Sequence, residues 1–299
     1  MIASLSALDV NEIKAVAMNL FEQAASAMLL LTQANPLLRL GAFFIAWVGC
    51  WLPLAIPIAA AINWHPPKPL ADGQKLPLLA SLYLIAPLLL WGIAKVEGKS
   101  FSSYGLPPNA TILGSLGLGF GLAVLSLVVV FGIEWALGWI DWQQSNSLQL
   151  SVWLPILLLG VWIGGTEELI FRGFVLNELV RGEYNEALTY AAAISSLIFA
   201  MLHLVWEIRE TLPQLPGLWL MGMVLVLARV CDKGNLGLAW GLHAGWIWGL
   251  TCIDSAKLIT YTGKGSAIFT GLAEKPLAGA AGILCLLGTA GVLFVIGNW

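Results

Sequence analysis

Three side chains that can carry out acid–base chemistry fall within strongly apolar stretches of the chain: Glu167, His203 and His243. An ionisable group inside a membrane is costly unless it is paired or hydrated. The three lie on different predicted helices, and a shared polar cavity would satisfy them together. A carboxylate can act as a general base on water. Two imidazoles can orient that water, bind a metal ion or donate to a developing oxyanion. The set predicts a hydrolytic site without a serine or cysteine nucleophile.

Two neighbours of Glu167 have types and spacing that suit a supporting role. Glu168 and Arg172 are four residues apart, so on a helix they share a face and can form an ion pair. Glu167 is rotated by about 100° from Glu168 around the same helix. We therefore expect Glu167 to stay outside that pair and to face the cavity.

Membrane-spanning helices must position these residues. The chain has 299 residues, of which 59% are hydrophobic and only 10% are charged, which is too little charge for a water-soluble globule. The apolar stretches are too long and too uniform for barrel strands. Since a spanning helix needs about 20 apolar residues, the sequence predicts an all-α polytopic transmembrane bundle of about eight spans. The predicted spans are residues 37–62, 76–94, 111–139, 151–177, 188–206, 216–231, 235–253 and 276–297.

The rest of the chain is predicted from its polarity. Residues 1–35 are predicted as an amphipathic or interfacial segment, and residues 36–299 as the transmembrane domain. Residues 254–275 are predicted as a loop, and Glu134, near the end of the third span, as an interfacial acid. With a net charge of −3, the chain has no basic surface for nucleic acid. Glycines in the third span predict close helix packing: Gly114, Gly117, Gly119 and Gly121.

Three motifs on the fourth, fifth and seventh predicted spans resemble those of the CPBP intramembrane proteases, the family of type II CAAX prenyl endopeptidases and bacteriocin-processing enzymes. Glu167 to Arg172 is similar to the family's EExxxR motif, Phe199 to His203 to its FxxxH motif, and His243 begins its HxxxN/D-type motif. The resemblance covers roughly residues 150–255. It implies an endopeptidase that works in a lipid bilayer on a peptide or membrane-protein substrate.

The resemblance also implies roles for individual residues. Glu167 would activate the attacking water, Glu168 and Arg172 would form a supporting pair, and Phe199 would be a further supporting residue. His203 and His243 would hold the water, the oxyanion or a metal ion, for which Zn²⁺ is the candidate because two histidines and a glutamate can form a catalytic zinc site. The implied location is a bacterial cytoplasmic membrane, with a thylakoid-type membrane as the alternative.

One position departs from the family pattern. Ile247 stands where the third motif usually has Asn or Asp, and an aliphatic side chain cannot orient water or donate to an oxyanion. Losing one such donor can cost about 10²–10³ in rate. Thr251, one turn further along, is a candidate substitute. Two alternatives to an active peptidase therefore stay open: a catalytically impaired scaffold or immunity-type protein of the same fold, and a transporter that uses the buried polar cluster.

Overall fold

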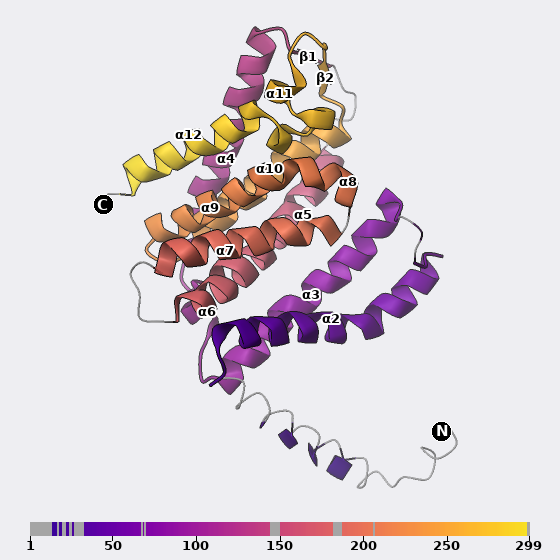
Figure 1. The fold of residues 1–299 in the computed structure, drawn as a ribbon, viewed down its shortest axis with the longest axis vertical. Coiled ribbons are helices and arrows are strands. Elements are labelled where there is room, and N and C mark those ends of the chain that lie inside the picture. The colour runs from indigo at the N-terminus through magenta and orange to yellow at the C-terminus, as the bar shows by residue number, and fades with distance from the viewer. Residues whose placement is uncertain are drawn as a thin grey trace.

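A computed structural model describes residues 14–16, 18–19, 22–23, 26, 33–66, 68, 70–143, 150–181, 187–205 and 207–297. This part of the chain is mostly helical (Figure 1). The predicted N-terminal segment, residues 1–35, lies largely outside the described residues. Asn35 and Pro36 begin the first long helix: the Asn35 side chain accepts a hydrogen bond from the Leu38 amide at 2.8 Å, and Pro36 occupies the first helical position.

Each of the eight predicted spans coincides with a helix. In the described residues six helical stretches are long and apolar enough to cross a membrane, those built on α2, α3, α4, α5–α6, α7 and α9. The seventh and eighth predicted spans are α10, which is rich in glycine and tryptophan, and α12, which has 17 residues. The predicted helical bundle is confirmed, and its span count is approximate. The long elements are α2 (Pro36–Ala61), α3 (Asp72–Val96), α4 (Thr111–Ala136), α5 (Leu150–Glu168), the π-helical η3 (Leu169–Val175), α6 (Leu176–Val180), α7 (Ala187–Leu202), α9 (Leu215–Cys231), α10 (Gly237–Ser255) and α12 (Ala280–Ile296).

The centre of the bundle is α10, which packs against α4 and α5. The contact with α4 is close because both helices have glycine there, and no side chain separates the two backbones. A Cβ atom on Gly119 would lie 2.2 Å from the Leu238 carbonyl oxygen, and one on Gly241 would lie 2.0 Å from that of Leu116. Of the four glycines predicted to serve this packing, Gly119 does so, whereas a Cβ on any of the other three would meet nothing within 4 Å.

A small antiparallel sheet connects the end of α4 to the segment predicted as a loop. Gly138, with φ of 70°, ends α4 in the left-handed region that glycine favours. Strand β1 (Ile140–Trp142) then pairs with β2 (Ile259–Tyr261). The prediction of a plain loop over 254–275 was therefore wrong in detail, because a three-residue strand gives too short an alternation to detect. The remaining short elements are η2 (Phe101–Tyr104), η4 (His203–Val205), α8 (Ile208–Thr211), η5 (Leu212–Gln214), α11 (Ala267–Thr270), η6 (Leu272–Glu274) and η7 (Pro276–Ala278).

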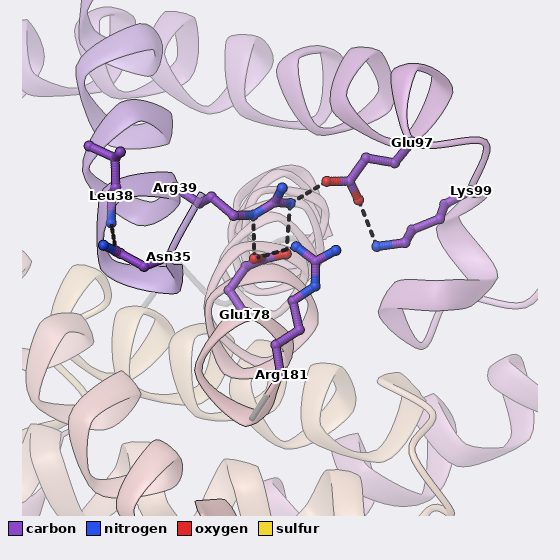
Figure 2. Close-up of polar contacts among 7 residues, drawn as sticks. All are labelled: Asn35, Leu38, Arg39, Glu97, Lys99, Glu178 and Arg181. Atoms are coloured by element: carbon purple, nitrogen blue, oxygen red, sulfur yellow. Dashed lines mark hydrogen bonds and ion pairs between the residues drawn. The ribbon is translucent and has the colours of Figure 1, made fainter. Parts of the chain in front are cut away.

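The α2–α3 pair lies at one edge of the bundle, and α12 lies at the other (Figure 1). Five charged residues, which we call the end clamp, connect this pair to α6: Arg39, Glu97, Lys99, Glu178 and Arg181 (Figure 2). Buried Arg39 donates to Glu178 at 2.5 Å and 3.0 Å and also contacts Glu97. Lys99 and Arg181 bind the same two carboxylates from outside, at 2.6 Å and 3.1 Å. The clamp thus fixes α3, which carries a residue of the site, against the helix that follows η3.

Candidate active site

The fourth predicted span changes its helical form at the residues singled out by the sequence. The α-helix α5 ends at Glu168 and continues as the π-helical segment η3, which contains Arg172. Glu167 and Glu168 are 5% and 0% exposed, and Arg172 is 0% exposed. Single π-helical turns are rare and occur frequently at functional sites. The change of pitch lies where two carboxylates and a guanidinium must be directed into the protein interior.

Glu168 lies between a guanidinium and an imidazole. Its Oε1 atom accepts a hydrogen bond from Arg172 Nη1 at 2.9 Å, so the predicted i,i+4 pair is present. The same oxygen is 2.8 Å from Nδ1 of His243 on α10. Because an ionised carboxylate only accepts hydrogen bonds, Nδ1 of His243 carries a proton. Glu168 therefore fixes the tautomer and the orientation of the His243 ring, as carboxylates commonly do for functional histidines.

Glu167 points away from the pair, as its rotation around the helix predicts. One of its oxygens accepts a hydrogen bond from the hydroxyl of Tyr83 on α3. The other lies 3.4 Å from Nε2 of His243, beyond the usual hydrogen-bond range of about 2.7–3.2 Å. We call Tyr83, Glu167, Glu168, Arg172 and His243 the carboxylate–histidine cluster. It brings together α3, the α5–η3 junction and α10.

His203 is close to this cluster but does not touch its carboxylates. It begins η4 at the end of α7, is half-buried, and has Nδ1 2.8 Å from the Phe199 carbonyl oxygen. Within the described ranges no carboxylate lies within ion-pairing distance of His203. The Phe199 ring contacts both imidazoles edge to face, with centroids 4.6 Å from His203 and 5.7 Å from His243. The expectation that all three chemical groups meet directly thus holds for Glu167 and His243, while His203 is one aromatic ring away.

Arg172 is held from several sides at the centre of the site. Its Nη2 atom donates to the Gly222 carbonyl at 3.2 Å, and its guanidinium carbon lies 4.5 Å from the centroid of the Phe199 ring. Arg229 on α9 donates to the backbone carbonyl of Arg172. Two buried polar atoms of the cluster find no hydrogen-bond partner among the described residues, Arg172 Nε and Glu168 Oε2. Arg172 is therefore held firmly in the cluster, but the hydrogen-bonding groups of the cluster are not all paired.

Ile247, which departs from the third motif, and Thr251, its candidate substitute, do not belong to the cluster. A Cβ atom on Gly160 would lie 3.4 Å from Cγ2 of Ile247, so Ile247 packs where α10 meets α5. Gly160 precedes Glu167 by about two helical turns. Thr251 is half-buried, and its side chain forms no hydrogen bond within the described residues. Any further donor in the site must therefore come from another element.

The arrangement of donors does not suit a zinc centre. A catalytic zinc ion takes three protein ligands, and in the part of the chain that the structure describes no group of three His, Cys, Asp or Glu side chains could hold a metal. Zinc stays a prediction of the sequence alone.

Sequence analysis missed two residues of this region, Tyr83 and Arg229. Tyr83 lies outside the three motifs, and its only sequence signal is a hydroxyl within an otherwise aliphatic stretch of the second span. Arg229 was visible as a cation inside the sixth span, and burying a charge there demands a partner. Neither signal predicts the partner, because Tyr83 contacts Glu167 and Arg229 contacts Arg172, and each pair joins segments that are far apart in the chain.

Comparison with protein families places this region in a known context. Residues 149–249 match the family described as type II CAAX prenyl endopeptidase Rce1-like. The match covers 101 of the 299 residues and includes the three motifs. Comparison with curated proteins and with solved structures finds no match. The family match confirms the predicted resemblance to the CPBP proteases, and the long apolar helices indicate an integral membrane protein.

Proposed function

We propose that this chain is an intramembrane endopeptidase in which Glu167 activates the water that attacks the scissile peptide bond. The observation that carries this proposal is the series of contacts from Arg172 through Glu168 to His243 and on to Glu167. A general base must be within hydrogen-bond reach of the proton it removes and must be held in place. In this cluster Tyr83 holds one oxygen of Glu167, which leaves the other directed at His243.

The contact between Glu167 and His243 provides a place for the water. Since Nδ1 of His243 donates to Glu168, Nε2 of the neutral ring presents a lone pair to the carboxylate of Glu167. Two acceptors that face each other are satisfied by a molecule that donates to both. A water can give one O–H to Glu167 and the other to His243, which leaves a lone pair on its oxygen for the substrate.

In the proposed reaction Glu167 accepts a proton from the water and later donates the same proton to the leaving amine. Glu167 takes a proton from the water while the water oxygen forms a bond to the carbonyl carbon. The same proton then passes to the amide nitrogen as the C–N bond breaks, which gives a carboxylic acid and an amine. As Glu167 becomes protonated, its hydrogen bond from Tyr83 weakens, and the Tyr83 hydroxyl can donate to the oxyanion instead. Tyr83 would thus supply the donor that Ile247 lacks.

His203 suits a role at the edge of the site. Because its Nδ1 faces a backbone acceptor, Nε2 of the neutral ring can only accept a hydrogen bond. In the charged form it can donate to the carbonyl oxygen of the substrate. His203 is half-buried, so a peptide that enters from the membrane would meet it before Glu167. By the resemblance, the substrates would be peptides or membrane proteins presented in the bilayer, and the membrane that of the bacterial cytoplasm.

The central test compares the wild type with Glu167→Gln in proteoliposomes that present prenylated and unmodified peptides. The amide keeps the shape of the side chain but cannot take a proton, so we expect cleavage to fall by about 10²–10⁴-fold. Glu210→Gln, at an exposed acid on α8, is the matched control and should cleave normally. Wild-type protein that is folded and cleaves no peptide would favour the inert scaffold. Equal cleavage by Glu167→Gln would remove Glu167 as the base.

The zinc question has a separate readout. Elemental analysis of purified wild type and His203→Ala would measure bound metal directly, whatever the activity. Because no group of three His, Cys, Asp or Glu side chains among the described residues could hold a metal, we expect no zinc at one equivalent per chain in either protein. A full equivalent in the wild type that is lost in His203→Ala would show that the side chains rearrange around a metal, and would overturn the metal-free mechanism.

A further inference from the structure

A cavity of about 550 Å³ lies between α4 and α12, on the side of the bundle away from the α2–α3 pair (Figure 1). Its walls are mostly apolar, with the hydroxyls of Ser126 and Thr289 and the carboxyl of Glu134 among them. Several wall residues, among them Val129, Ile133 and Leu284, are also exposed on the surface of the protein. The cavity is therefore open to the lipid, and its volume lies in the range of about 300–1,000 Å³ that is typical of ligand sites. None of its walls belongs to the carboxylate–histidine cluster.

Glu134 is the unusual feature of this cavity. Its side chain is 3% exposed, so this acid near the end of α4 is buried within the protein. Its Oε2 atom has no hydrogen-bond partner, and among the described residues no basic side chain pairs with it. The two wall hydroxyls are already engaged: Ser126 donates to the Ala123 carbonyl and Thr289 to that of Cys285. A carboxylate buried without a partner is costly, so the protein leaves one strong acceptor in the wall of a mostly apolar cavity.

We propose that this cavity binds an amphiphile that has a single alkyl chain and a primary ammonium head. The chain would lie between α4 and α12, and the ammonium group would donate to Glu134. The buried acid selects this class, because an ammonium head can pair with its ionised form, an anionic head would be repelled and a chain without a donor would leave the acid unpaired. The Trp139 ring in the wall offers a second favourable contact to a cation. The site does not depend on the peptidase proposal, since it shares no residue with that mechanism.

The test is photolabelling of the protein in nanodiscs with a dodecylamine that carries a diazirine at the end of its chain. We expect labelling to saturate, to map by mass spectrometry to peptides of α4 and α12, and to be displaced by excess dodecylamine but not by dodecanol. Glu134→Gln keeps the shape of the side chain and removes its charge. It should raise the concentration for half-saturation by about tenfold or more, because a charge-assisted hydrogen bond is lost.

A second pair of variants tests the cavity independently of the charge. A Cβ at Gly288 or at Gly291 on α12 would meet nothing within 4 Å, so both positions accept a larger side chain, but only Gly288 lines the cavity. Gly288→Leu should fill the cavity and abolish saturable labelling, whereas Gly291→Leu should label as the wild type does. Labelling that does not saturate, that dodecanol displaces equally well, or that is unchanged in Glu134→Gln and Gly288→Leu would overturn the proposal and indicate ordinary lipid contact.

Discussion

Among the described residues, buried charged side chains pair with one another in two clusters, and these clusters differ in how completely their charges are satisfied. In the end clamp each carboxylate accepts from two basic groups: Glu97 from Arg39 and Lys99, and Glu178 from Arg39 and Arg181 (Figure 2). In the carboxylate–histidine cluster two carboxylates share a single guanidinium and an imidazole. Glu168 Oε2 and Arg172 Nε find no hydrogen-bond partner there among the described residues.

This difference separates a structural cluster from a site that can do chemistry. Buried polar groups are normally paired, so each exception needs an explanation. The end clamp needs no such explanation, because Lys99 and Arg181 reach the surface and complete the pairing of its two carboxylates. In the carboxylate–histidine cluster one oxygen of Glu167 lies 3.4 Å from Nε2 of His243, beyond the usual hydrogen-bond range, and the proposed mechanism places the water there. Incomplete pairing is what the proposed mechanism uses.

The largest effect is expected from Arg172→Met. Removing the guanidinium leaves Glu168 buried with only His243 as a partner, and breaking a buried pair in this way costs about 3–5 kcal/mol. The free energy of unfolding in mixed micelles, measured by titration with a denaturing detergent, should fall by that amount. The double variant Glu168→Gln/Arg172→Met removes both charges and should recover much of the loss. A single variant as stable as the wild type would show that the pair does not stabilise the fold.

The sequence predicts the parts of this picture that depend on local spacing. The i,i+4 relation of Glu168 and Arg172 is a property of any helix, so their pair could be predicted before the fold was known. The outward rotation of Glu167 follows from the same helical geometry. The helical bundle could also be predicted, since burial in lipid demands long apolar helices, although only six helical stretches among the described residues are long and apolar enough to cross a membrane.

The parts that could not be predicted involve contacts between distant segments. Tyr83 reaches Glu167 across 84 residues, and the phenol carries no motif. The displacement of His203 by the ring of Phe199 depends on where α7 ends, and helix ends are set by packing more than by local pattern. The burial of Glu134 arises because α12, far along the chain, covers the end of α4. A single sequence does not encode such pairings in its spacing.

The second effect is on catalysis. Tyr83→Phe removes one hydrogen bond to a charged group, worth about 1.5–3 kcal/mol, and keeps the aromatic ring. We expect kcat on a membrane-presented peptide to fall by about 10–100-fold with little change in KM, because the hydroxyl acts on Glu167 and the oxyanion. Tyr190→Phe, at a tyrosine that is 69% exposed on α7, is the control. An unchanged kcat in Tyr83→Phe would leave the site without the donor we assign in place of Ile247.

A smaller effect on stability is expected from Arg39→Met in the end clamp. Glu97 and Glu178 keep Lys99 and Arg181 as partners, so the loss should be about 1.5–2 kcal/mol, less than for Arg172→Met. The kcat of the folded protein should not change, since the clamp touches no reacting group. Arg209→Met, at an exposed arginine on α8, controls for loss of charge. A destabilisation as large as that of Arg172→Met would mean that the outer cations contribute nothing, and the contrast between the clusters would fail.

The smallest effect is a dependence on pH that belongs to the end clamp. Burial by itself would raise the pKa of Glu97, but hydrogen bonds from Lys99 and Arg39 outweigh it and hold the pKa below its ordinary value, which is about 4.3. A carboxyl whose pKa is lowered by folding stabilises the protein above its unfolded pKa, and the contribution is lost as the pH falls through the folded pKa. The stability difference between wild type and Glu97→Gln should therefore be constant from neutral pH to about 5 and shrink below about 4.3. Comparing the two proteins at each pH cancels the titration of other carboxyls. A difference that grew on acidification would mean that Glu97 is protonated in the fold, and the clamp would then be as incompletely paired as the cluster around His243.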